Sequence, residues 1–392
     1  MSPFNPTAEY SAIREGVANV CEAFPGAYWR DLDSRRAYPK DFVNALIREG
    51  YLAAMIPEAY GGSGLNLMAS AVILEEIHRN GCNAAACHAQ MYTMGTVLRH
   101  GNDEQKQKWL PGIAEGSLRL QAFGVTEPTS GTDTLALKTT ARRDGDSYVI
   151  NGQTIWTSRA EHSDLMLLLA RTTPRGEAKS KTDGLSVFLL DLRELVGNGI
   201  EIRPIRAMIN HATTEVFFDN VRIPASALIG EEGKGFRYIL SGMNLERILI
   251  GAECIGDAKW FIDKAANYAK ERVIFGAPIG KNQGVQFPIA KAYAHMLAAE
   301  AIVYRAAAMY DSGLNPGVEA NTAKMLAADA SWEAAEACLQ THGGFGFAEE
   351  YDVERKFREA RLYQVAPIST NLILCYIAEQ VLGLPKSYGE AR

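Results

Sequence analysis

The chain contains 392 residues, of which 47% are hydrophobic and 22% are charged, and its formal net charge is −6. This composition is typical of a globular protein of two or three domains and excludes a disordered or fibrous chain. The acidic balance argues against nucleic acid as the main partner, because a nucleic-acid-binding protein is expected to carry a strongly basic face.

Signals for targeting and metal binding are missing from the sequence. Apolar runs stay below the roughly 18 residues that a membrane span needs. The early acidic residues Glu9, Glu15 and Glu22 fit neither a signal peptide nor a transit peptide. The six cysteines are scattered and form no C-x-x-C pair. We therefore expect reduced cysteines, a cytoplasmic location and no metal site.

Residues 1–122 are predicted to form an N-terminal helical domain. Apolar residues recur at helical spacing around Phe42 and again over 68–77. The glycine-rich segment IPEAYGGSGLN (56–66) predicts a turn between helices rather than a phosphate loop, since it lacks a strand–helix context. A short helix over 102–113 is expected to stop near Pro111.

Residues 123–232 are predicted to form a central antiparallel β-domain. Two turn dipeptides, Asp144-Gly145 and Asn151-Gly152, are expected to separate strands over 135–143, 148–150 and 153–156. The remaining strands are expected over 165–170, 185–192, 199–205 and 215–223, with an exposed polar loop over 171–183. Because no helices alternate with these strands, the pattern excludes a Rossmann sheet.

Residues 233–392 are predicted to form a C-terminal helical bundle. One apolar face of a long first helix is expected to hold Phe236, Leu240, Met243, Ile250 and Cys254. Further helices are expected near 283–311, 316–340 and 371–383. A structural ion-pair network is the expected role of Glu354, Arg355 and Arg358. Together the three zones predict an α+β fold that is mostly α.

Five short motifs follow one another in a distinctive order. They are FGVTEPTSGTD (123–133), NGQTIWTS (151–158), GEEGKGF (230–236), ERVIFGAPIGKNQ (271–283) and QTHGGFGFAEEYDVERKFREAR (340–361). Each is weak alone, but their order and spacing resemble the acyl-CoA dehydrogenase family over about residues 40–385. The resemblance implies an FAD-dependent flavoprotein, usually a homotetramer, that oxidises an acyl-CoA thioester to the 2,3-enoyl-CoA. In that family a carboxylate removes the α-proton while the β-hydrogen leaves as hydride to the flavin.

The resemblance also implies which residues contact FAD. Val125 and Thr126 would face the N1–C2=O edge, where the reduced flavin accumulates negative charge. Arg272 would bind the FAD pyrophosphate of a neighbouring subunit through its bidentate guanidinium. The full implied set is Phe123, Val125, Thr126, Trp156, Ser158, Arg272, Phe275, Gln283, Gln340, Gly343, Gly344, Ser369, Thr370 and Asn371. Ser369 or Thr370 has a second reading as the cap of the last helix.

The catalytic base is where the chain departs from most of the family. Most members carry it in a segment resembling YEGT-x-E, but the aligned stretch APISTN (366–371) places Pro367 there, which has no ionisable group. A branch that includes isovaleryl-CoA dehydrogenase carries it in a segment like L-E-R, and GMNLERILIG (242–251) puts Glu246 at that position. Burial would raise the pKa of this carboxyl toward neutrality, as a general base requires. Glu253, seven residues further on, is the reserve candidate.

The sequence also indicates substrate-binding residues and is compatible with more than one reaction. The resemblance places Thr132, Asn244, Arg247, Pro367 and Ile368 at substrate positions. The proline–isoleucine pair narrows the pocket, which favours a short or branched acyl group, and an electron-transfer flavoprotein is the expected acceptor. A relative could instead eliminate a β-substituent such as sulfinate without net oxidation, although the retained Glu246 argues against this. A non-enzymatic flavoprotein is the third reading.

Overall fold

The computed structural model describes residues 8–386, which form two compact units. Unit 1 consists of the described residues of Met1–Asp31, Asn66–Ala84 and Asn244–Arg392. Unit 2 consists of Leu32–Leu65 and Ala85–Met243. Each unit is described separately. In the described part of the chain, no helix is both long and apolar enough to cross a bilayer.

Unit 2 is built around a mixed sheet that is mostly antiparallel. Its strands are β1 (Leu120–Gly124), β2 (Thr140–Asp144), β3 (Ser147–Ser158), β4 (Leu165–Arg171), β5 (Leu185–Asp191), β6 (Ile200–Pro204), β7 (Thr213–Pro224) and β8 (Leu228–Ile229). The spatial order is β6-β7-β3-β2-β4-β5-β8, and β1 pairs with β4 off this path. The pairs β1–β4 and β2–β4 are parallel, and the other pairs of this sheet are antiparallel.

Strand β4 lies between two hydrophobic cores. Its odd-numbered residues Leu165, Leu167 and Leu169 pack into the same cluster as residues of α5 (Ala85–His100) and α6 (Asp103–Glu115). Its even-numbered residues Met166, Leu168 and Ala170 belong to a second cluster, which also contains Tyr148, Phe188 and Phe218. Because successive side chains of a strand point to opposite faces, an unbroken apolar run buries both faces of the sheet.

The other described helices of the N-terminal half have at most 13 residues each. They are α1 (Ser11–Glu22), α2 (Gly26–Arg35), α3 (Lys40–Arg48), α4 (Leu67–Arg79) and the single turn α7 (Leu192–Leu195). The predicted turn over 56–66 is confirmed and contains a 3-10 turn, Glu58–Tyr60. The N-cap of α6 is a capping box in which Asn102 and Gln105 satisfy each other's backbone N–H.

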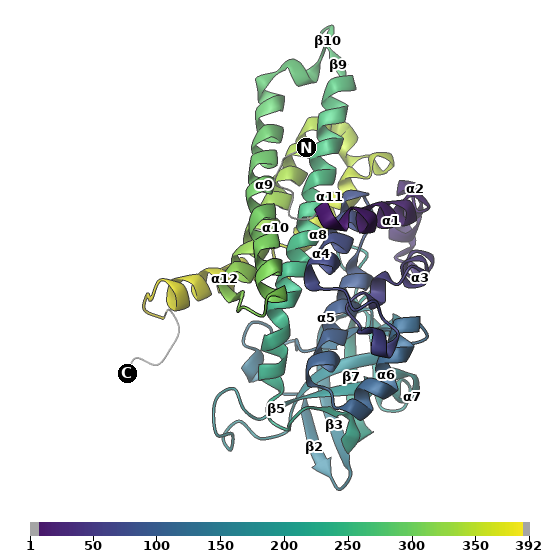
Figure 1. Cartoon of the computed structure of the whole chain (residues 1–392), viewed down its shortest axis with the longest axis vertical. Helices are drawn as coiled ribbons and strands as arrows, with labels where there is room; N and C mark the ends of the chain where they lie inside the picture. Colours follow the sequence, from purple (N-terminus) through teal and green to yellow (C-terminus); the bar gives the residue numbers. More distant parts are fainter. Residues whose placement is uncertain (1–7, 387–392) are drawn as a thin grey trace. The chain divides into compact units, whose positions relative to one another are not determined.

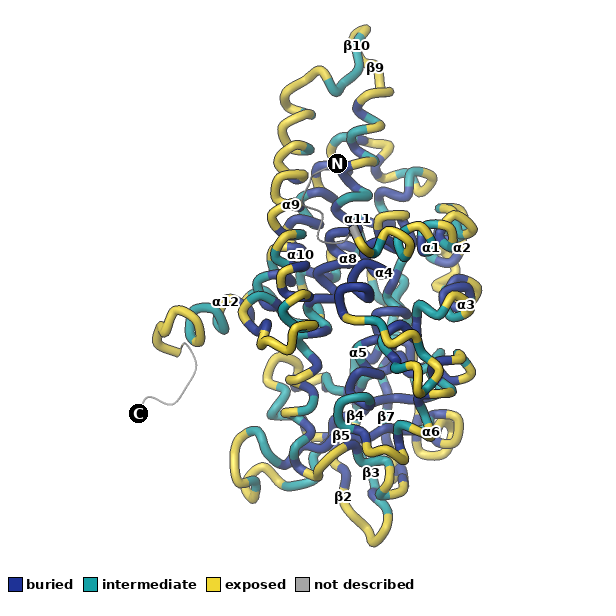
Figure 2. Tube along the Cα trace, in the orientation of Figure 1, coloured by how far each residue is buried: buried dark blue, intermediate teal, exposed yellow. Residues whose placement is uncertain are grey.

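The C-terminal part is helical, as predicted. Its helices are α8 (Gly235–Glu271), α9 (Gln283–Asp311), α10 (Gly317–His342), α11 (Val353–Leu362) and α12 (Thr370–Tyr376), followed by a π-helical turn, Ile377–Val381. In unit 1, α9 packs against α10, and α10 packs against α11 (Figure 1). Figure 2 shows that buried residues follow α8 and α10, whereas the hairpin of β9 (Val273–Ile274) and β10 (Ala277–Pro278) is exposed or half-buried.

Three details of the sequence-based assignment of unit 2 are wrong. The dipeptide Asn151-Gly152 is not a turn but part of the continuous strand β3, where the register with β7 shifts between Ile150 and Gly152. A Cβ at Gly152 would lie 2.4 Å from Oγ1 of Thr139, so glycine here permits close strand packing. Pro111 lies inside α6, because buried Leu110 and Ile113 on either side outweigh one lost helical hydrogen bond.

The third error concerns the start of β2. The strand begins at Thr140 rather than near 135, because residues Thr134–Ala136 form a 3-10 turn. The carboxylate of Glu127 accepts the backbone N–H groups of Lys138 and Thr139 at 2.6–2.9 Å. These bonds close the loop that begins after β1 and hold the chain out of the sheet until Thr140.

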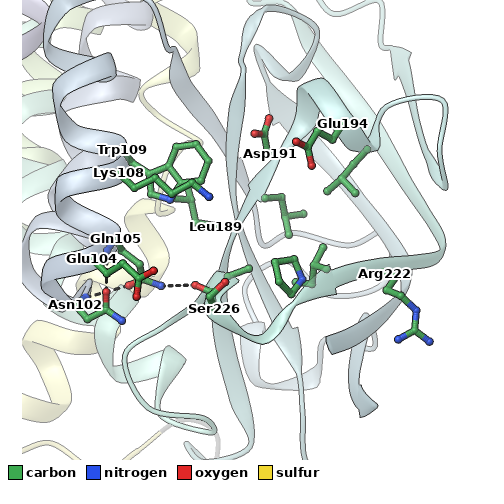
Figure 3. A pocket seen from close by; sticks show the side chains of 15 residues that line it. Asn102, Glu104, Gln105, Lys108, Trp109, Leu189, Asp191, Glu194, Arg222 and Ser226 are labelled. Carbon is green, nitrogen blue, oxygen red and sulfur yellow. Dashed lines mark hydrogen bonds between the residues drawn. The ribbon is translucent and has the colours of Figure 1, made fainter. Parts of the chain in front are cut away.

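One cavity of unit 2 lies beside α6. It encloses about 160 Å³, and Figure 3 shows Lys108, Trp109, Asp191 and Glu194 among its lining residues. The amide of Gln105 closes it by donating to the carbonyl oxygens of Ser226 and Leu228, each at 2.8 Å. None of the residues predicted to contact flavin or substrate lines this cavity, so it has no part in the candidate active site.

Candidate active site

Two predicted flavin segments meet in unit 2. Strand β1 ends at Gly124, and the carbonyl oxygen of Thr126 accepts the backbone N–H of Ile155 in β3 at 2.8 Å. A Cβ at Gly124 would lie 2.3 Å from Cε of Met166 and 3.1 Å from Cδ1 of Leu168, so a larger residue would require these side chains to move. The bond places Val125 and Thr126 next to the strand segment that carries Trp156.

Trp156 is held in a strained conformation that turns its indole outward. Its φ of 60° lies in the left-handed region, and the register between β3 and β7 shifts between Thr154 and Thr157. The hydroxyls of these two buried threonines are hydrogen-bonded to each other at 2.9 Å, which closes the bulge. The Trp156 residue is 57% exposed. A bulky residue in this region costs about 1–3 kcal/mol and is retained mainly at functional positions.

The remaining predicted residues of unit 2 lie around these two segments. Ser158 ends β3 half-buried, with its hydroxyl 3.2 Å from that of Thr213. Phe123 is half-buried, and its ring meets that of Tyr92 edge-on, with ring centroids 6.0 Å apart. Thr132 lies exposed on the loop closed by Glu127. The sequence analysis did not single out Glu127, whose role in shaping this loop appears only in the structure.

In unit 1, a tight hairpin presents the predicted residues Arg272 and Phe275. Phe275 and Gly276 connect β9 to β10 with φ values of 53° and 78°, the signature of a two-residue type I′ turn. Such turns favour Asn-Gly, so a phenylalanine at positive φ is strained, and its side chain is fully exposed. The Arg272 guanidinium stacks on the Phe345 ring at 5.5 Å. The hairpin is therefore joined to the predicted glycine loop.

The glycine loop is open around its two predicted residues. A Cβ at Gly343 or Gly344 would meet no described atom of the chain within 4 Å, and Gly343 has a φ of 59°. Gln340 and Gln283, at the end of α10 and the start of α9, are exposed. Internal packing therefore does not account for glycine at 344.

Glu246 lies half-buried on α8 between Leu245 and Arg247. The Arg247 guanidinium donates to the amide oxygen of Asn244 at 2.9 Å. Burial lowers the pKa of Arg247 below its usual value, although Glu246 and Tyr376 act in the opposite direction. Its Nε is buried without a hydrogen-bond partner in the described part of the chain. One hydrogen-bond donor beside Asn244 is therefore left unsatisfied by the described residues.

A buried lysine that the sequence analysis missed connects α10 to the segment that carries Pro367. Lys324 has a relative exposure of 0%, and its ammonium donates to the carbonyl oxygens of Tyr363 and Ile368, each at 2.7 Å. Burial lowers the pKa of Lys324, and attraction to Cys254, Asp329 and Glu246 does not restore it. A lysine inside the alanine-rich run TAKMLAADA was the signal available in the sequence.

The segment after Tyr363 carries the last predicted residues. Pro367 is exposed and Ile368 is half-buried. Ser369 is the N-cap of α12, and its hydroxyl accepts the backbone N–H of Leu372, as the capping reading predicted. Thr370 begins this helix half-buried, and Asn371 is exposed.

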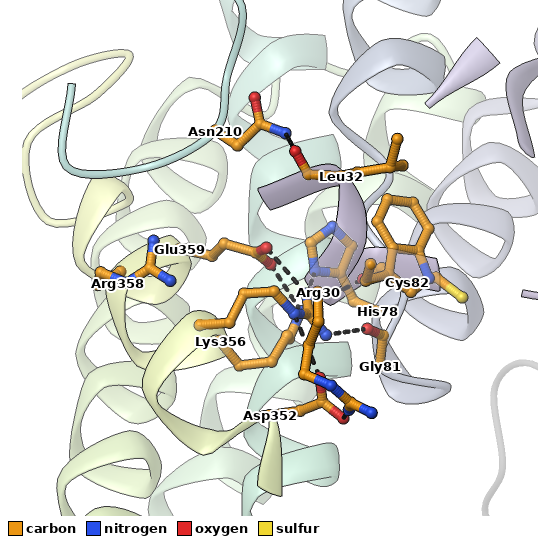
Figure 4. A network of polar contacts seen from close by, with 12 residues as sticks. Arg30, Leu32, His78, Gly81, Cys82, Asn210, Asp352, Lys356, Arg358 and Glu359 are labelled. Carbon is orange, nitrogen blue, oxygen red and sulfur yellow. Dashed lines mark hydrogen bonds and ion pairs between the residues drawn. The ribbon is translucent and has the colours of Figure 1, made fainter. Parts of the chain in front are cut away.

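Glu253, the reserve base, lies in a different environment. It is 1% exposed, and its carboxylate accepts the Tyr363 hydroxyl at 2.9 Å. It borders a buried network in unit 1, part of which is drawn in Figure 4, that joins His78, Asp257, Lys356 and Glu359. The expected ion-pair role of Glu354, Arg355 and Arg358 agrees with the bonds Glu354–Arg358 and Arg355–Glu359, at 2.8 and 2.9 Å. Glu253 is therefore in contact with Tyr363 and with His78 of this network.

These features fit a large, flat, anionic cofactor. Trp156 and Phe275 are aromatic residues held at positive φ with their rings exposed, and Gly344 leaves space that a Cβ would fill. Arg272 supplies the fork-shaped donor that a pyrophosphate prefers. Exposed aromatic, arginine and glycine residues of this kind, in a chain of helical–β–helical order, are typical of flavin-dependent oxidoreductases.

Comparison with known proteins agrees with this class. Sequence models of the acyl-CoA dehydrogenase N-terminal, middle and C-terminal domains match residues 7–117, 122–221 and 233–382. Acyl-CoA dehydrogenase FadE12 of Mycobacterium tuberculosis is 33% identical over 390 residues, 98% of this chain and 99% of the relative. Glutaryl-CoA dehydrogenase of Desulfococcus multivorans is 31% identical over 393 residues, with coverage of 98% and 99%.

A solved structure is similarly close. The complex of a glutaryl-CoA dehydrogenase with glutaryl-CoA superposes with a TM-score of 0.90 at 30% identity, covering 99% of both chains. The chain belongs to the acyl-CoA dehydrogenase family. It is therefore a flavoprotein oxidoreductase whose cofactor is FAD, and the predicted α+β, mostly α fold is confirmed.

Proposed function

We propose that the protein catalyses FAD-dependent α,β-dehydrogenation of an acyl-CoA thioester, with Glu246 as the catalytic base. The observation that carries this assignment is the half-buried carboxyl on α8, which has electrostatic contact with Arg247 and Lys324, while Pro367 has no group that accepts a proton. Both cations favour the ionised form of a neighbouring carboxyl. Glu246 is thereby prepared to accept a proton.

Each residue has a defined task in this reaction. The Glu246 carboxylate takes the α-proton, and the C–H bonding pair becomes the second bond between Cα and Cβ. Bound FAD supplies the acceptor for the β-hydrogen, which leaves as hydride. Val125 and Thr126 hold the N1–C2=O edge, and Trp156 and Ser158 border the ring. Arg247, Asn244, Thr132, Pro367 and Ile368 bind the thioester and its pantetheine arm.

The substrate, the assembly and the electron acceptor complete the proposal. The half-buried Ile368 beside Pro367 favours a short or branched acyl group. The Desulfococcus multivorans relative, which aligns over nearly its whole sequence, is named for the short dicarboxylic thioester glutaryl-CoA. We also propose the domain boundaries 1–122, 123–232 and 233–392. The proposed enzyme is a cytoplasmic homotetramer that passes electrons to an electron-transfer flavoprotein.

An anaerobic titration of the purified holoprotein tests the proposed reaction. A panel of straight, branched, dicarboxylic and cyclic acyl-CoAs is added while the flavin absorbance near 450 nm is followed. Bleaching by a short or branched thioester is the expected result. Elimination from a β-substituted acyl-CoA without an electron acceptor, and with no bleaching by saturated thioesters, would favour the alternative reaction instead.

Replacing Lys324 with methionine is expected to move the acid limb of the flavin-reduction rate upward by about one pH unit. Removing this cation raises the pKa of the nearby Glu246 carboxyl, so the base becomes protonated at a higher pH. The measurement is the stopped-flow reduction rate between pH 5 and 9. Lys270→Met, an exposed lysine of α8, is the control with the same charge change. An unchanged pH profile in Lys324→Met would contradict the electrostatic role.

Replacing Phe275 with alanine is expected to lower FAD retention, because the hairpin is proposed to complete the flavin site of a neighbouring subunit. The dissociation constant for FAD is expected to rise about tenfold, and the loss to grow on dilution. The ratio of absorbance at 450 and 280 nm measures retention. Leu314→Ala removes another exposed apolar side chain beyond the end of α9 and is expected to keep full flavin content. Full retention in Phe275→Ala at every concentration would refute the shared site.

A further inference from the structure

Two of the six cysteines, all of which are free thiols in the structure, lie side by side in unit 1. Cys21 is the last residue but one of α1, and Cys82 follows the end of α4 by three residues. Phe24 touches both: its backbone N–H donates to the carbonyl oxygen of Cys21 at 2.9 Å, and its own carbonyl oxygen accepts the Cys82 thiol at 3.8 Å. The two side chains are also hydrogen-bonded to each other. The fold therefore brings together two sulfur atoms that are 61 residues apart in the sequence.

The Cys82 sulfur is surrounded by hydrogen-bond donors and positive charge. The Cys21 thiol and the indole N–H of the buried Trp29 both donate to it. The ammonium of the buried Lys356 donates to the carbonyl oxygen of Cys82 at 3.3 Å, and the guanidinium of Arg355 donates to that of the preceding residue at 3.1 Å (Figure 4). Such surroundings stabilise a thiolate, which is the form of cysteine that acts as a nucleophile.

The two thiols of the pair are not equivalent. The hydrogen bond to Cys82 raises the pKa of Cys21, and burial acts in the same direction. The same hydrogen bond lowers the pKa of Cys82, although burial opposes this, and Trp29, Lys356 and Arg355 assist it. Cys82 therefore loses its proton more readily, while Cys21 remains a thiol in contact with it. A thiolate next to a second, protonated cysteine is the arrangement found in redox-sensitive pairs.

We propose that Cys21 and Cys82 form a reversible disulfide when the protein meets hydrogen peroxide. The Cys82 thiolate attacks one peroxide oxygen, the O–O bond breaks, and a sulfenic acid forms while the other oxygen leaves as hydroxide. The Cys21 sulfur then attacks the Cys82 sulfur, the S–O bond breaks, and the hydroxyl leaves with the Cys21 proton as water. The first hydroxide recombines with the proton that Cys82 had lost. Two thiols thus give up two electrons, and one peroxide becomes two waters.

The position of the pair limits the oxidant and sets the consequence of the bond. Cys21 is 4% exposed and Cys82 is 0% exposed, so the oxidant must be small, and hydrogen peroxide is close to water in size. The disulfide would tie α1 to the turn after α4, which Lys356 and Arg355 hold in the buried network. A cross-link between residues this far apart restricts the unfolded chain and therefore favours the folded one.

Peptide mapping of the FAD-loaded protein tests the proposal without any acyl-CoA. The reduced holoprotein is treated with hydrogen peroxide, quenched with catalase, alkylated with N-ethylmaleimide in denaturant and digested with trypsin without reductant. The disulfide joins the tryptic peptides 15–30 and 80–99, which carry Cys21 and Cys82. Because the second peptide also contains Cys87, the variant Cys87→Ser is the matched control.

The wild type and Cys87→Ser are both expected to give the linked peptides, and dithiothreitol is expected to release them. Cys21→Ser is expected to stop at a Cys82 sulfenic acid, which dimedone labels, whereas Cys82→Ser is expected to leave Cys21 as a thiol. The oxidised wild type is expected to unfold about 5 °C above the reduced wild type, a comparison that needs no variant.

Two results would overturn the proposal. One is the absence of linked peptides at a peroxide concentration that oxidises the half-buried Cys375. The other is a cross-link that persists in Cys82→Ser and disappears in Cys87→Ser, which would assign the reaction to the neighbouring thiol. Neither result depends on which thioester reduces the flavin or on which carboxylate is the base.

Discussion

Replacing Glu246 with glutamine is expected to leave the protein folded and yellow but to slow flavin reduction by acyl-CoA about 10²–10⁴-fold, the usual contribution of a positioned general base. Glutamine has nearly the same volume and still forms hydrogen bonds, but it does not take up the α-proton. Anaerobic stopped-flow absorbance at 450 nm measures the rate, and the FAD content of the variant confirms that its binding site is intact.

Two variants on the same helix sharpen this result. Asp263→Asn removes one exposed negative charge from α8 and is expected to leave the rate unchanged. Glu253→Gln alters the buried carboxyl bonded to Tyr363 and is expected to reduce stability more than the rate. Normal flavin reduction in Glu246→Gln together with a large loss in Glu253→Gln would transfer the base to the reserve position.

Replacing Lys356 with methionine is expected to destabilise unit 1 by about 3–5 kcal/mol, because it leaves buried charges without their partner. Lys356 is fully buried, 2.5 Å from Oδ1 of Asp257 and 3.3 Å from Oε2 of Glu359. The N–H of Ala84 donates to Nε2 of His78, and Nδ1 of the same ring lies 2.8 Å from Oδ1 of Asp257. This carboxylate therefore depends on both neighbours.

Urea unfolding of the holoprotein, followed by circular dichroism, measures the loss. Lys291→Met breaks an ion pair with Glu333 at a surface position and is expected to change stability by less than about 1 kcal/mol. The double variant Asp257→Asn/Lys356→Met removes both charges and is expected to recover part of the stability. Equal destabilisation by Lys291→Met and Lys356→Met would show that burial of the network is not decisive.

The same network determines the pH range of stability. Burial, the largest single influence, would raise the pKa of Asp257, but attraction to Lys356 and His78 and the hydrogen bonds from both together outweigh it, so the pKa lies below its ordinary value of 3.8. This contribution to stability is complete above that value and is lost as the pH falls through the lower folded-state pKa. Burial opposes the charge of Lys356, yet Asp257 and Glu359 raise its pKa above 10.5. That contribution is complete below pH 10.5 and is lost as the pH rises through the folded-state pKa.

The fold was largely predictable because the spacing of apolar residues along the sequence indicates which faces of helices and strands are buried. The unbroken apolar run of β4 indicated a buried strand at the right place, and of the apolar face predicted for α8, Ile250 and Cys254 are buried whereas Leu240 is exposed. The errors arose where tertiary contacts overrule local signals. At Gly152 the strand passes so close to Thr139 that a side chain would collide with it. At Pro111 the helix continues because Leu110 and Ile113 on either side of the proline are buried in the core. The highly charged α11 was missed because its buried residues include Arg355 and Lys356, which read as polar in a sequence.

The candidate site was predictable only where a motif names the residue. The order of the five motifs pointed to Trp156, Arg272 and Phe275. It did not indicate that Trp156 and Phe275 have positive φ values and exposed side chains. Lys324 escaped notice because its partners are main-chain oxygens of a distant segment, and carbonyl groups leave no signature in a sequence.

The position of β4 between two hydrophobic cores affects how unit 2 loses its structure. Leu165, Leu167 and Leu169 secure one core, and Met166 and Leu168 secure the other, so withdrawing this strand opens both at once. Neither core has an independent melting transition under this arrangement. Mutational damage to one side of the sheet is therefore shared by the other, and the unit denatures as an indivisible cooperative block.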